Sequence, residues 1–209
     1  MVGLKGKTAC LSRNGRGGIG TALRNALTEA GVTLFDDTDP ACPVDFAICT
    51  AGKMFVCDPG ELQSSDVRQL YEANFFYPRV FMERHIRAMR TARKQGVILH
   101  IGSNAARYGN GGAADYAAMK AALAKYVELR GKSVRNDGIR LSLINVGAVA
   151  TEFWNKVRKT ADPELLSDIM PTPAKALTAD EVADLVLMVL QLPERVVLKD
   201  ALVVSVDYQ

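Results

Sequence analysis

The chain has 209 residues, of which 48% are apolar and 23% are charged, with 17 glycines and 8 prolines. This composition excludes collagen-like, coiled-coil and disordered chains, and the length favours one well-buried domain spanning residues 1–209. The net charge is only +3, and the basic run near the end of one predicted helix has no interleaved aromatic residues, so we expect no nucleic-acid partner.

The sequence lacks the features of an exported or membrane-spanning chain. No apolar run approaches the ~18 residues of a membrane span, and the first segment has no continuous apolar region of the kind found in secretion signals. We therefore expect a cytoplasmic protein that begins near Met1 and has no membrane partner. The four cysteines show no Cys-x-x-Cys spacing, which predicts buried free thiols and no metal site.

Strand-like and helix-like segments alternate along the chain, which predicts an α/β fold with a doubly wound parallel sheet of about six strands and helices on both faces. The predicted strands are residues 8–11, 32–35, 46–49, 97–101, 139–144 and 196–206. The predicted helices are residues 19–30, about 64–94, about 113–130 and 179–192, the last of them with a capping box from Thr178 and Glu181. We expect a loop at 102–112 and an irregular, amphipathic substrate-loop region at about 151–177.

A glycine-rich turn, Ser12-Arg13-Asn14-Gly15-Arg16-Gly17-Gly18-Ile19-Gly20, joins the first predicted strand to the first predicted helix. Backbone N–H groups and the helix dipole can hold a pyrophosphate at such a position. Glycines also serve ordinary strand-to-helix turns, so this motif alone does not decide the function.

Three side chains further along the sequence fit acid/base chemistry. Tyr116 and Lys120 are four residues apart on a predicted helix and project from the same face, where the ammonium can stabilise a phenolate. A tyrosine that acts as a base near neutrality needs its pKa lowered by about three units, which nearby positive charge and hydrogen bonds can supply. Ser103 follows a buried strand, at the sheet edge where α/β folds bind their ligands.

These motifs, in this order and over nearly the whole length, resemble the short-chain dehydrogenase/reductase family, which implies a Rossmann-like fold and a homodimer or homotetramer. By that resemblance, Tyr116 is the general acid/base, and Ser103 hydrogen-bonds the reacting oxygen. Lys120 lowers the tyrosine pKa and holds the nicotinamide ribose, and Asn74 holds a proton-relay water. The implied cofactor-binding residues are Asn14, Gly18, Ile19, Gly20, Asp36, Ala51, Gly52, Lys120, Gly147, Val149 and Thr151.

The chain departs from the family pattern at several positions. Asn14 replaces the first glycine of the turn, although asparagine tolerates a left-handed backbone. Cys49-Thr50 replaces two asparagines before Ala51 and Gly52, and Val146 replaces the proline before Gly147.

The largest departure is the near absence of about forty residues between the second strand and the strand at 46–49. Two registrations are open: residues 32–35 are the second strand and Asp36 or Asp37 meets the adenosine ribose, or residues 36–38 are the remnant of the third strand. Asp36 near a ribose favours NAD, whereas Arg13 and Arg16 favour NADP. The cofactor is therefore NAD or NADP.

The sequence supports three functions. The first is an oxidoreductase that interconverts a carbonyl and an alcohol on a small molecule. The second is a family-fold protein with weakened or lost dinucleotide binding, which serves binding or assembly. The third is a non-redox dehydratase or isomerase that uses the same Tyr116 and Lys120. Phe153, Trp154 and Met170 indicate either an apolar lid over the substrate or an ordinary loop anchor. We expect His85 to be solvated and His100 to have a structural partner.

Overall fold

The computed structural model describes residues 3–38, 42–109, 111–158, 161, 163–170 and 175–207, apart from the side chains of Asn14, Pro59, Arg158 and Asp168. Within them lies a six-stranded parallel sheet with the strand order β2-β1-β3-β4-β5-β6. The strands are β1 (Thr8–Leu11), β2 (Thr33–Phe35), β3 (Phe46–Cys49), β4 (Gly96–Ser103), β5 (Ile139–Val146) and β6 (Asp200–Val203). The predicted Rossmann-like α/β sheet is confirmed.

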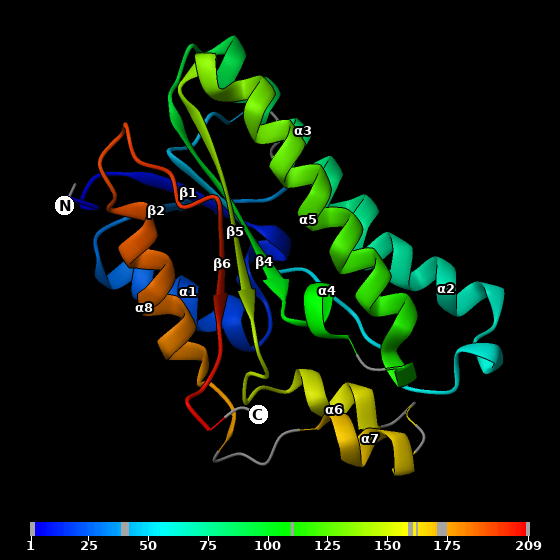
Figure 1. Cartoon of the computed structure of the whole chain (residues 1–209). Helices are drawn as coiled ribbons and strands as arrows, with labels where there is room; N and C mark the ends of the chain where they lie inside the picture. The colour runs from blue at the N-terminus through cyan, green and yellow to red at the C-terminus, as the bar shows by residue number, and fades with distance from the viewer. Residues whose placement is uncertain are drawn as a thin grey trace.

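Helices cover both faces of this sheet (Figure 1). They are α1 (Gly18–Glu29), α2 (Ser64–Tyr71), α3 (Tyr77–Thr91), α4 (Ala105–Tyr108), α5 (Ala114–Val134), α6 (Phe153–Arg158), α7 (Pro163–Ile169) and α8 (Ala179–Leu190). Helices α1 and α8 lie on one face, whereas α2, α3 and α5 lie on the other. Helices α4, α6 and α7 lie near the tips of the strand arrows, at the carboxyl edge of the sheet.

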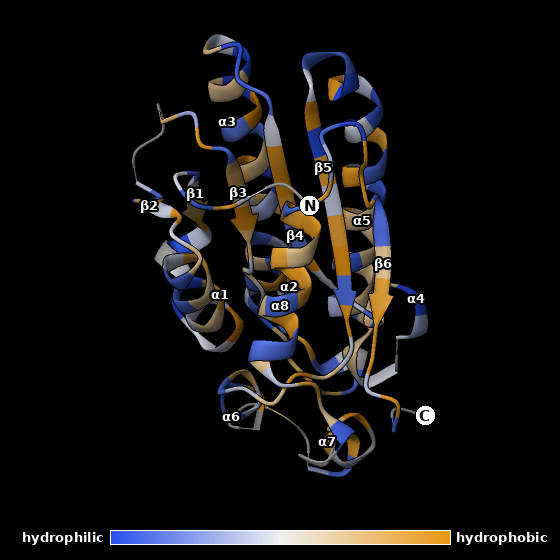
Figure 2. Cartoon of the chain, turned by 90° about the vertical axis from the view of Figure 1, so that its left-hand side faces the viewer, coloured by the Kyte–Doolittle hydropathy of each residue, from blue (hydrophilic) through white to orange (hydrophobic). Residues whose placement is uncertain are grey.

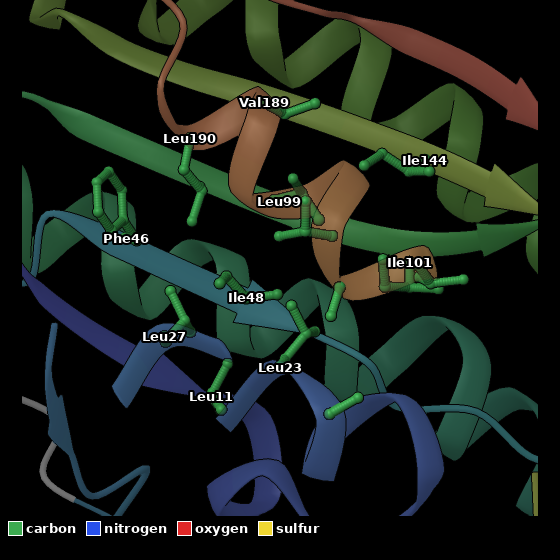
Figure 3. Close-up of a cluster of buried hydrophobic side chains, with 14 of the residues drawn as sticks. Leu11, Leu23, Leu27, Phe46, Ile48, Leu99, Ile101, Ile144, Val189 and Leu190 are labelled. Atoms are coloured by element: carbon green, nitrogen blue, oxygen red, sulfur yellow. The ribbon is translucent and has the colours of Figure 1, made fainter. Parts of the chain in front are cut away.

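The core has two layers because successive side chains of a strand point to opposite faces. Phe46 and Ile48 of β3 pack with Leu23, Leu27 and Leu190 of α1 and α8 (Figure 3). The alternate residues Ala47 and Cys49 pack with Phe81 and Leu123 of α3 and α5. Coloured by hydropathy, β3 is apolar, β5 and β6 include polar positions, and the helices carry both polar and apolar positions (Figure 2). Among the described residues, no helix is long and apolar enough to cross a membrane.

Strand β2 pairs in parallel with β1 at the edge of the sheet, with Thr33 opposite Thr8. Residues 36–38 continue as a turn. Residues 33–35 are therefore the second strand, as in the first of the two registrations, and β3 pairs directly with the other side of β1.

Four predicted boundaries differ from the structure. The helix predicted at 64–94 is interrupted by a π-helical turn, η3 (Glu72–Phe76). Strand β4 continues through Ser103, and the predicted loop after it holds α4. The region at 151–177 holds α6 and α7. Strand β6 is shorter than predicted because Arg140 Nη1 donates to the carbonyls of residues 192, 193 and 196, which holds that stretch in a turn.

The four cysteines are free thiols, as predicted, but only Cys10 and Cys49 are buried, whereas Cys42 and Cys57 are partly exposed. Both histidine predictions are wrong. His85 is 2% exposed, because the face of α3 that carries it packs on the sheet beside Phe81, with ring centroids 4.5 Å apart. His100 lies inside β4, and neither ring nitrogen has a hydrogen-bond partner among the described residues. Burial lowers the pKa of His85 to about 4 and that of His100 to about 3.

These two imidazoles make the stability of the protein pH-dependent. Their pKa values lie below the ordinary 6.5, so the unfolded chain binds more protons and stability falls as the pH drops below 6.5. When the pH is lowered from about 7.5 to about 5, each ring should lower the free energy of unfolding by about 2 kcal/mol. Urea unfolding at both pH values should show this loss, and His100→Leu should remove about half of it. An unchanged pH dependence in that variant would contradict the assignment.

Candidate active site

A cleft of about 550 Å³ opens at the carboxyl edge of the parallel sheet, the usual ligand-binding position in open α/β sheets. The glycine turn, the ends of β3 and β4, one face of α5 and the loop after β5 form its walls, and residues of α6 and α7 line its outer side. The predicted site residues that line the cleft are Gly18, Ile19, Gly20, Ala51, Gly52, Ser103, Tyr116, Lys120, Gly147, Val149 and Thr151.

The glycine turn folds tightly before the first turn of α1. A Cβ atom added to Gly20 would lie 2.8 Å from the carbonyl carbon of Gly15, so no side chain fits between them. Positive φ angles fall on Arg13 (52°), Gly15 (65°) and Gly17 (95°). The sequence analysis placed the left-handed backbone at Asn14, which instead lies within the 3-10 turn η1 (Ser12–Gly15). The amino end of α1 forms one wall of the cleft.

The loop after β5 lies against this amino end. A Cβ atom added to Gly18 would come within 2.3 Å of Thr151 Cγ2. The loop is fixed at two further points: Gly147 N donates to Val203 O at 2.8 Å, and Trp154 Nε1 donates to Val149 O at 3.1 Å.

Tyr116 and Lys120 lie one turn apart on α5 and are 8% and 4% exposed. Lys120 Nζ lies 5.7 Å from the centroid of the tyrosine ring and donates to Ala51 O at 3.5 Å. Both side chains therefore reach the inner part of the cleft, between β3 and β4, as their spacing predicted.

The pKa values of this pair are set mainly by burial. Burial raises the pKa of Tyr116, whereas a hydrogen bond with the side chain of Ser103 lowers it. Burial lowers the pKa of Lys120 to about 8. The group that lowers the pKa of Tyr116 is Ser103, whereas the family resemblance assigns this effect to Lys120. Tyr116 keeps its proton at neutral pH.

Ser103 ends β4, and its backbone is fixed by a residue to which the sequence analysis gave no role. Asn145 Oδ1 accepts from Ser103 N at 3.1 Å, and Asn145 Nδ2 donates to Asp200 Oδ1 at 2.7 Å. Asn145 is 1% exposed. An asparagine near the end of a buried strand is the sequence signal that could have indicated this role.

Gly102 leaves the space that Asn145 occupies, and a Cβ atom there would lie 2.1 Å from Asn145 Oδ1. Gly102→Ala should therefore displace the asparagine side chain and destabilise the protein by roughly 1–3 kcal/mol. Gly111→Ala is the matched control, because nothing lies within 4 Å of its added Cβ atom. Urea unfolding of the two variants tests this prediction, and equal stabilities would contradict it.

Asn74 lies behind the cleft, fully buried at the centre of the π-helical turn. Its Nδ2 donates to Leu70 O at 2.9 Å and to Lys53 O at 2.7 Å, and its Oδ1 accepts from Lys53 N at 3.1 Å. Because the side chain takes the carbonyl that the backbone N–H of residue 74 would use in an α-helix, it accounts for the π-helical turn. The amide fixes residue 53 just after Gly52.

Asp36 and Asp37 differ in their surroundings. Asp36 is exposed, and its Oδ1 accepts from Thr38 N and Thr38 Oγ1, both at 2.7 Å. Asp37 is 9% exposed and forms an ion pair with Arg84. With Cys10 and His85, Asp37 forms a group whose potential metal-ligand atoms lie within 4.8 Å of one another. The Arg84 guanidinium already supplies a positive charge there.

A family profile described as short chain dehydrogenase matches residues 39–162, more than half of the chain. The chain belongs to the short-chain dehydrogenase family. Two curated relatives of this chain are the NADP-dependent 3-hydroxy acid dehydrogenase of Schizosaccharomyces pombe, 30% identical over 122 residues, and the vibriobactin-specific 2,3-dihydro-2,3-dihydroxybenzoate dehydrogenase of Vibrio cholerae, 33% identical over 113 residues. The matches cover 58% and 54% of this chain but only 46% and 43% of those proteins, so they span less than half of either relative.

Solved structures show the same fold at low sequence identity. An alcohol dehydrogenase from Thermococcus sibiricus, complexed with 5-hydroxy-NADP, superposes with a TM-score of 0.76 at 20% identity, covering 97% of this chain and 98% of that one. The closed form of a serine dehydrogenase complexed with NADP⁺ superposes with a TM-score of 0.78 at 18% identity, covering 97% and 96%. A short-chain dehydrogenase/reductase from Mycobacterium marinum gives 0.79 at 18% identity, covering 96% and 94%.

Proposed function

We propose that this short-chain dehydrogenase is an NAD(P)-dependent oxidoreductase that interconverts a carbonyl and an alcohol on a small molecule, with Tyr116 as general acid/base. The observation that carries the proposal is the burial of Tyr116 and Lys120 together, with Ser103 hydrogen-bonded to the tyrosine in the same cleft. Burying a phenol and an ammonium costs free energy, and such costly groups in a cleft are typical of functional sites.

The residues present fit the nicotinamide half of the cofactor. A Cβ atom on Gly52 would lie 3.3 Å from both Lys120 Nζ and Asn74 Oδ1, so the bare backbone of residue 52 packs closely against these two buried side chains. We assign Lys120 to the ribose, the loop with Gly147, Val149 and Thr151 to the carboxamide, and the amino end of α1 to the pyrophosphate. When bound, NAD(P)H supplies the hydride that the carbonyl carbon accepts.

The chain supplies the proton. In the reducing direction, Tyr116 donates its phenolic proton to the carbonyl oxygen, and Ser103 Oγ donates a hydrogen bond to the same oxygen. The Lys120 ammonium stabilises the phenolate that Tyr116 becomes, and a water held by Asn74 Oδ1 returns the proton. Burial keeps Tyr116 protonated at neutral pH. The enzyme is therefore ready to donate a proton, which is what carbonyl reduction needs.

We propose that both NADPH and NADH serve as cofactors. The NADP dependence of the Schizosaccharomyces pombe relative supports NADPH. Arg13 and Arg16 line the cleft beside the amino end of α1 and carry positive charge that suits the phosphates of either nucleotide. The Asp36 carboxylate, which favours NAD in the sequence analysis, already accepts two hydrogen bonds from Thr38.

The outer part of the cleft indicates the kind of substrate. Met54, Phe153, Trp154 and Met170 line it with apolar surface, and Lys156 and Lys175 lie at the same wall. Both curated relatives are named for hydroxylated acids. We propose a small, partly apolar carbonyl compound that carries a carboxylate.

Turnover with a panel of carbonyl compounds tests the proposal. The purified protein should oxidise NADPH or NADH in the presence of small aromatic or aliphatic keto acids, and more slowly with the matching neutral ketones. If no member of the panel is reduced by protein that NAD(P)H protects against thermal unfolding, the redox reaction is contradicted and a dehydratase or isomerase activity becomes the better assignment.

A further inference from the structure

The loop after β2 carries three aspartates, of which Asp36 and Asp37 are described by the structure and Asp39 lies outside the described residues. In Rossmann sheets an acidic residue about 20 residues beyond the glycine turn hydrogen-bonds the adenosine ribose. Asp36 and Asp37 stand at about that spacing from the turn that ends at Gly20. The contacts of these two carboxylates therefore decide how the adenosine half is recognised.

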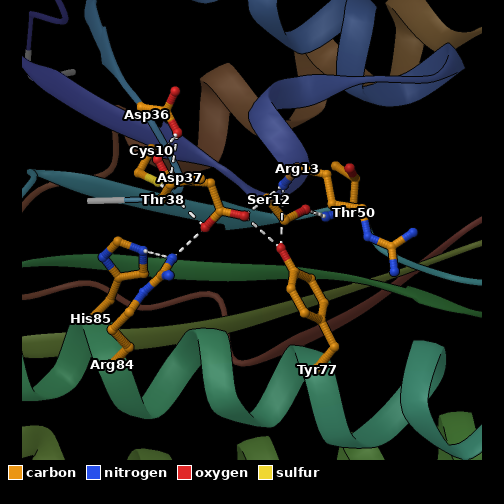
Figure 4. Close-up of polar contacts among 10 residues, drawn as sticks. All are labelled: Cys10, Ser12, Arg13, Asp36, Asp37, Thr38, Thr50, Tyr77, Arg84 and His85. Carbon is orange, nitrogen blue, oxygen red and sulfur yellow. Dashed lines mark hydrogen bonds and ion pairs between the residues drawn. The ribbon is translucent and has the colours of Figure 1, made fainter. Parts of the chain in front are cut away.

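The Asp37 carboxylate is fully engaged by this chain (Figure 4). Its Oδ2 accepts from Arg13 N at 2.8 Å and from Tyr77 Oη at 2.6 Å, and its Oδ1 forms an ion pair with Arg84. Cys10 Sγ lies 4.0 Å from Oδ1. Three protein donors thus occupy the acceptor positions that ribose hydroxyls need.

Tyr77 and Arg84 reach the Asp37 carboxylate from helix α3. They stand seven residues apart on α3, on one face of the helix. The Arg13 guanidinium lies over the Tyr77 ring, 5.1 Å from its centroid. The Tyr77 hydroxyl and the Arg84 guanidinium thus meet at Asp37, and the Arg13 guanidinium lies against the Tyr77 ring.

The described lining of the cleft does not extend to the loop after β2. This lining runs from Ser12, Arg13 and Arg16 to the substrate side, and none of the described residues in 33–38 or 42–49 belongs to it. One oxygen of the Asp36 carboxylate, Oδ1, is also engaged within the loop, because it accepts from the backbone and the side chain of Thr38. The nicotinamide half fits the residues present, whereas the adenosine half does not.

We propose that this protein recognises only the nicotinamide, ribose and phosphate half of its cofactor, and that Tyr77 and Arg84 determine this specificity by holding Asp37. The inference rests on the proposed function. If so, reduced nicotinamide mononucleotide, which lacks the adenosine phosphate of NADH, should bind with an affinity similar to that of NADH.

Titration calorimetry of the wild-type chain with NADH and with reduced nicotinamide mononucleotide tests this inference without any substitution. We expect the two dissociation constants to agree within about threefold, equivalent to less than about 0.7 kcal/mol of binding free energy from adenosine. NADH bound about 30-fold or more tightly than the mononucleotide would overturn the inference and leave the proposed function standing. Binding of neither would overturn the proposed function and the inference with it.

A pair of variants tests the role of α3. Arg84→Gln combined with Tyr77→Phe releases Asp37 while keeping the ring, and should raise the preference for NADH over the mononucleotide at least threefold. Arg87→Gln is the control, since Arg87 is an exposed residue of the same helix. An unchanged preference in the folded double variant would contradict the role of Tyr77 and Arg84.

Discussion

Tyr116→Phe should lower kcat for carbonyl reduction by about 10²–10⁴-fold, because the variant has no proton to give to the carbonyl oxygen. Its affinity for NADPH should stay within about twofold, since the hydroxyl serves proton transfer and the glycine turn and Lys120 hold the nucleotide. Steady-state kinetics together with a binding titration separate these two effects.

Tyr126→Phe is a suitable control for this experiment. Tyr126 lies on the same helix, and its hydroxyl bonds Glu83 at 3.1 Å on the α3 side, outside the cleft. It should keep kcat within about twofold. Full activity of Tyr116→Phe, or an equal loss in both variants, would contradict the role proposed for Tyr116.

Lys120→Met should make the protein more stable while removing its turnover. The pKa of Lys120 is about 8, below its ordinary 10.5, because burial disfavours the ammonium. The folded protein therefore carries a cost of roughly 3 kcal/mol below pH 8, and this cost fades as the pH rises to 10.5. Methionine fills similar space without the charge, so the free energy of unfolding at neutral pH should rise by up to about 3 kcal/mol.

The pH dependence of this stability gain identifies its cause. The difference between Lys120→Met and the wild type should be full at about pH 7 and should shrink above about pH 8. Lys125→Met, at an exposed position of the same helix where Lys125 Nζ pairs with Glu128 at 2.7 Å, should change stability by less than about 0.5 kcal/mol. A loss of stability in Lys120→Met would contradict a desolvated ammonium. Retained turnover would contradict its place in the site.

The sequence predicts the sheet well because its information is local. Periodicity and β-branching identify strands such as 8–11 and 46–49, whose predicted bounds agree with β1 and β3. The spacing of Tyr116 and Lys120 on a helix predicts a shared face, and both side chains do line the cleft. These features depend on neighbours within one or two helical turns.

The features that the sequence did not predict depend on distant residues. The bonds of Asp37 to Tyr77 and Arg84 join positions 40 and 47 residues apart, and Asn145 bonds Ser103 across 42 residues. His85 is buried because it lies on the face of α3 that packs on the sheet. The many arginines of this helix made a solvent-exposed face the expected position from the sequence. Contacts between residues far apart in the sequence determine these positions, and a local sequence pattern does not predict such contacts.

Binding of the nicotinamide cofactor is the most direct test of the proposed oxidoreductase function. Trp154, the single tryptophan, lines the cleft and reports on it by fluorescence. Titration with NADPH and with NADH should quench this emission saturably, with a dissociation constant below about 1 mM and one site per chain. Emission that stays unchanged by either nucleotide up to several times about 1 mM, with calorimetry also silent, would contradict the oxidoreductase assignment and support a family-fold protein that has lost dinucleotide binding.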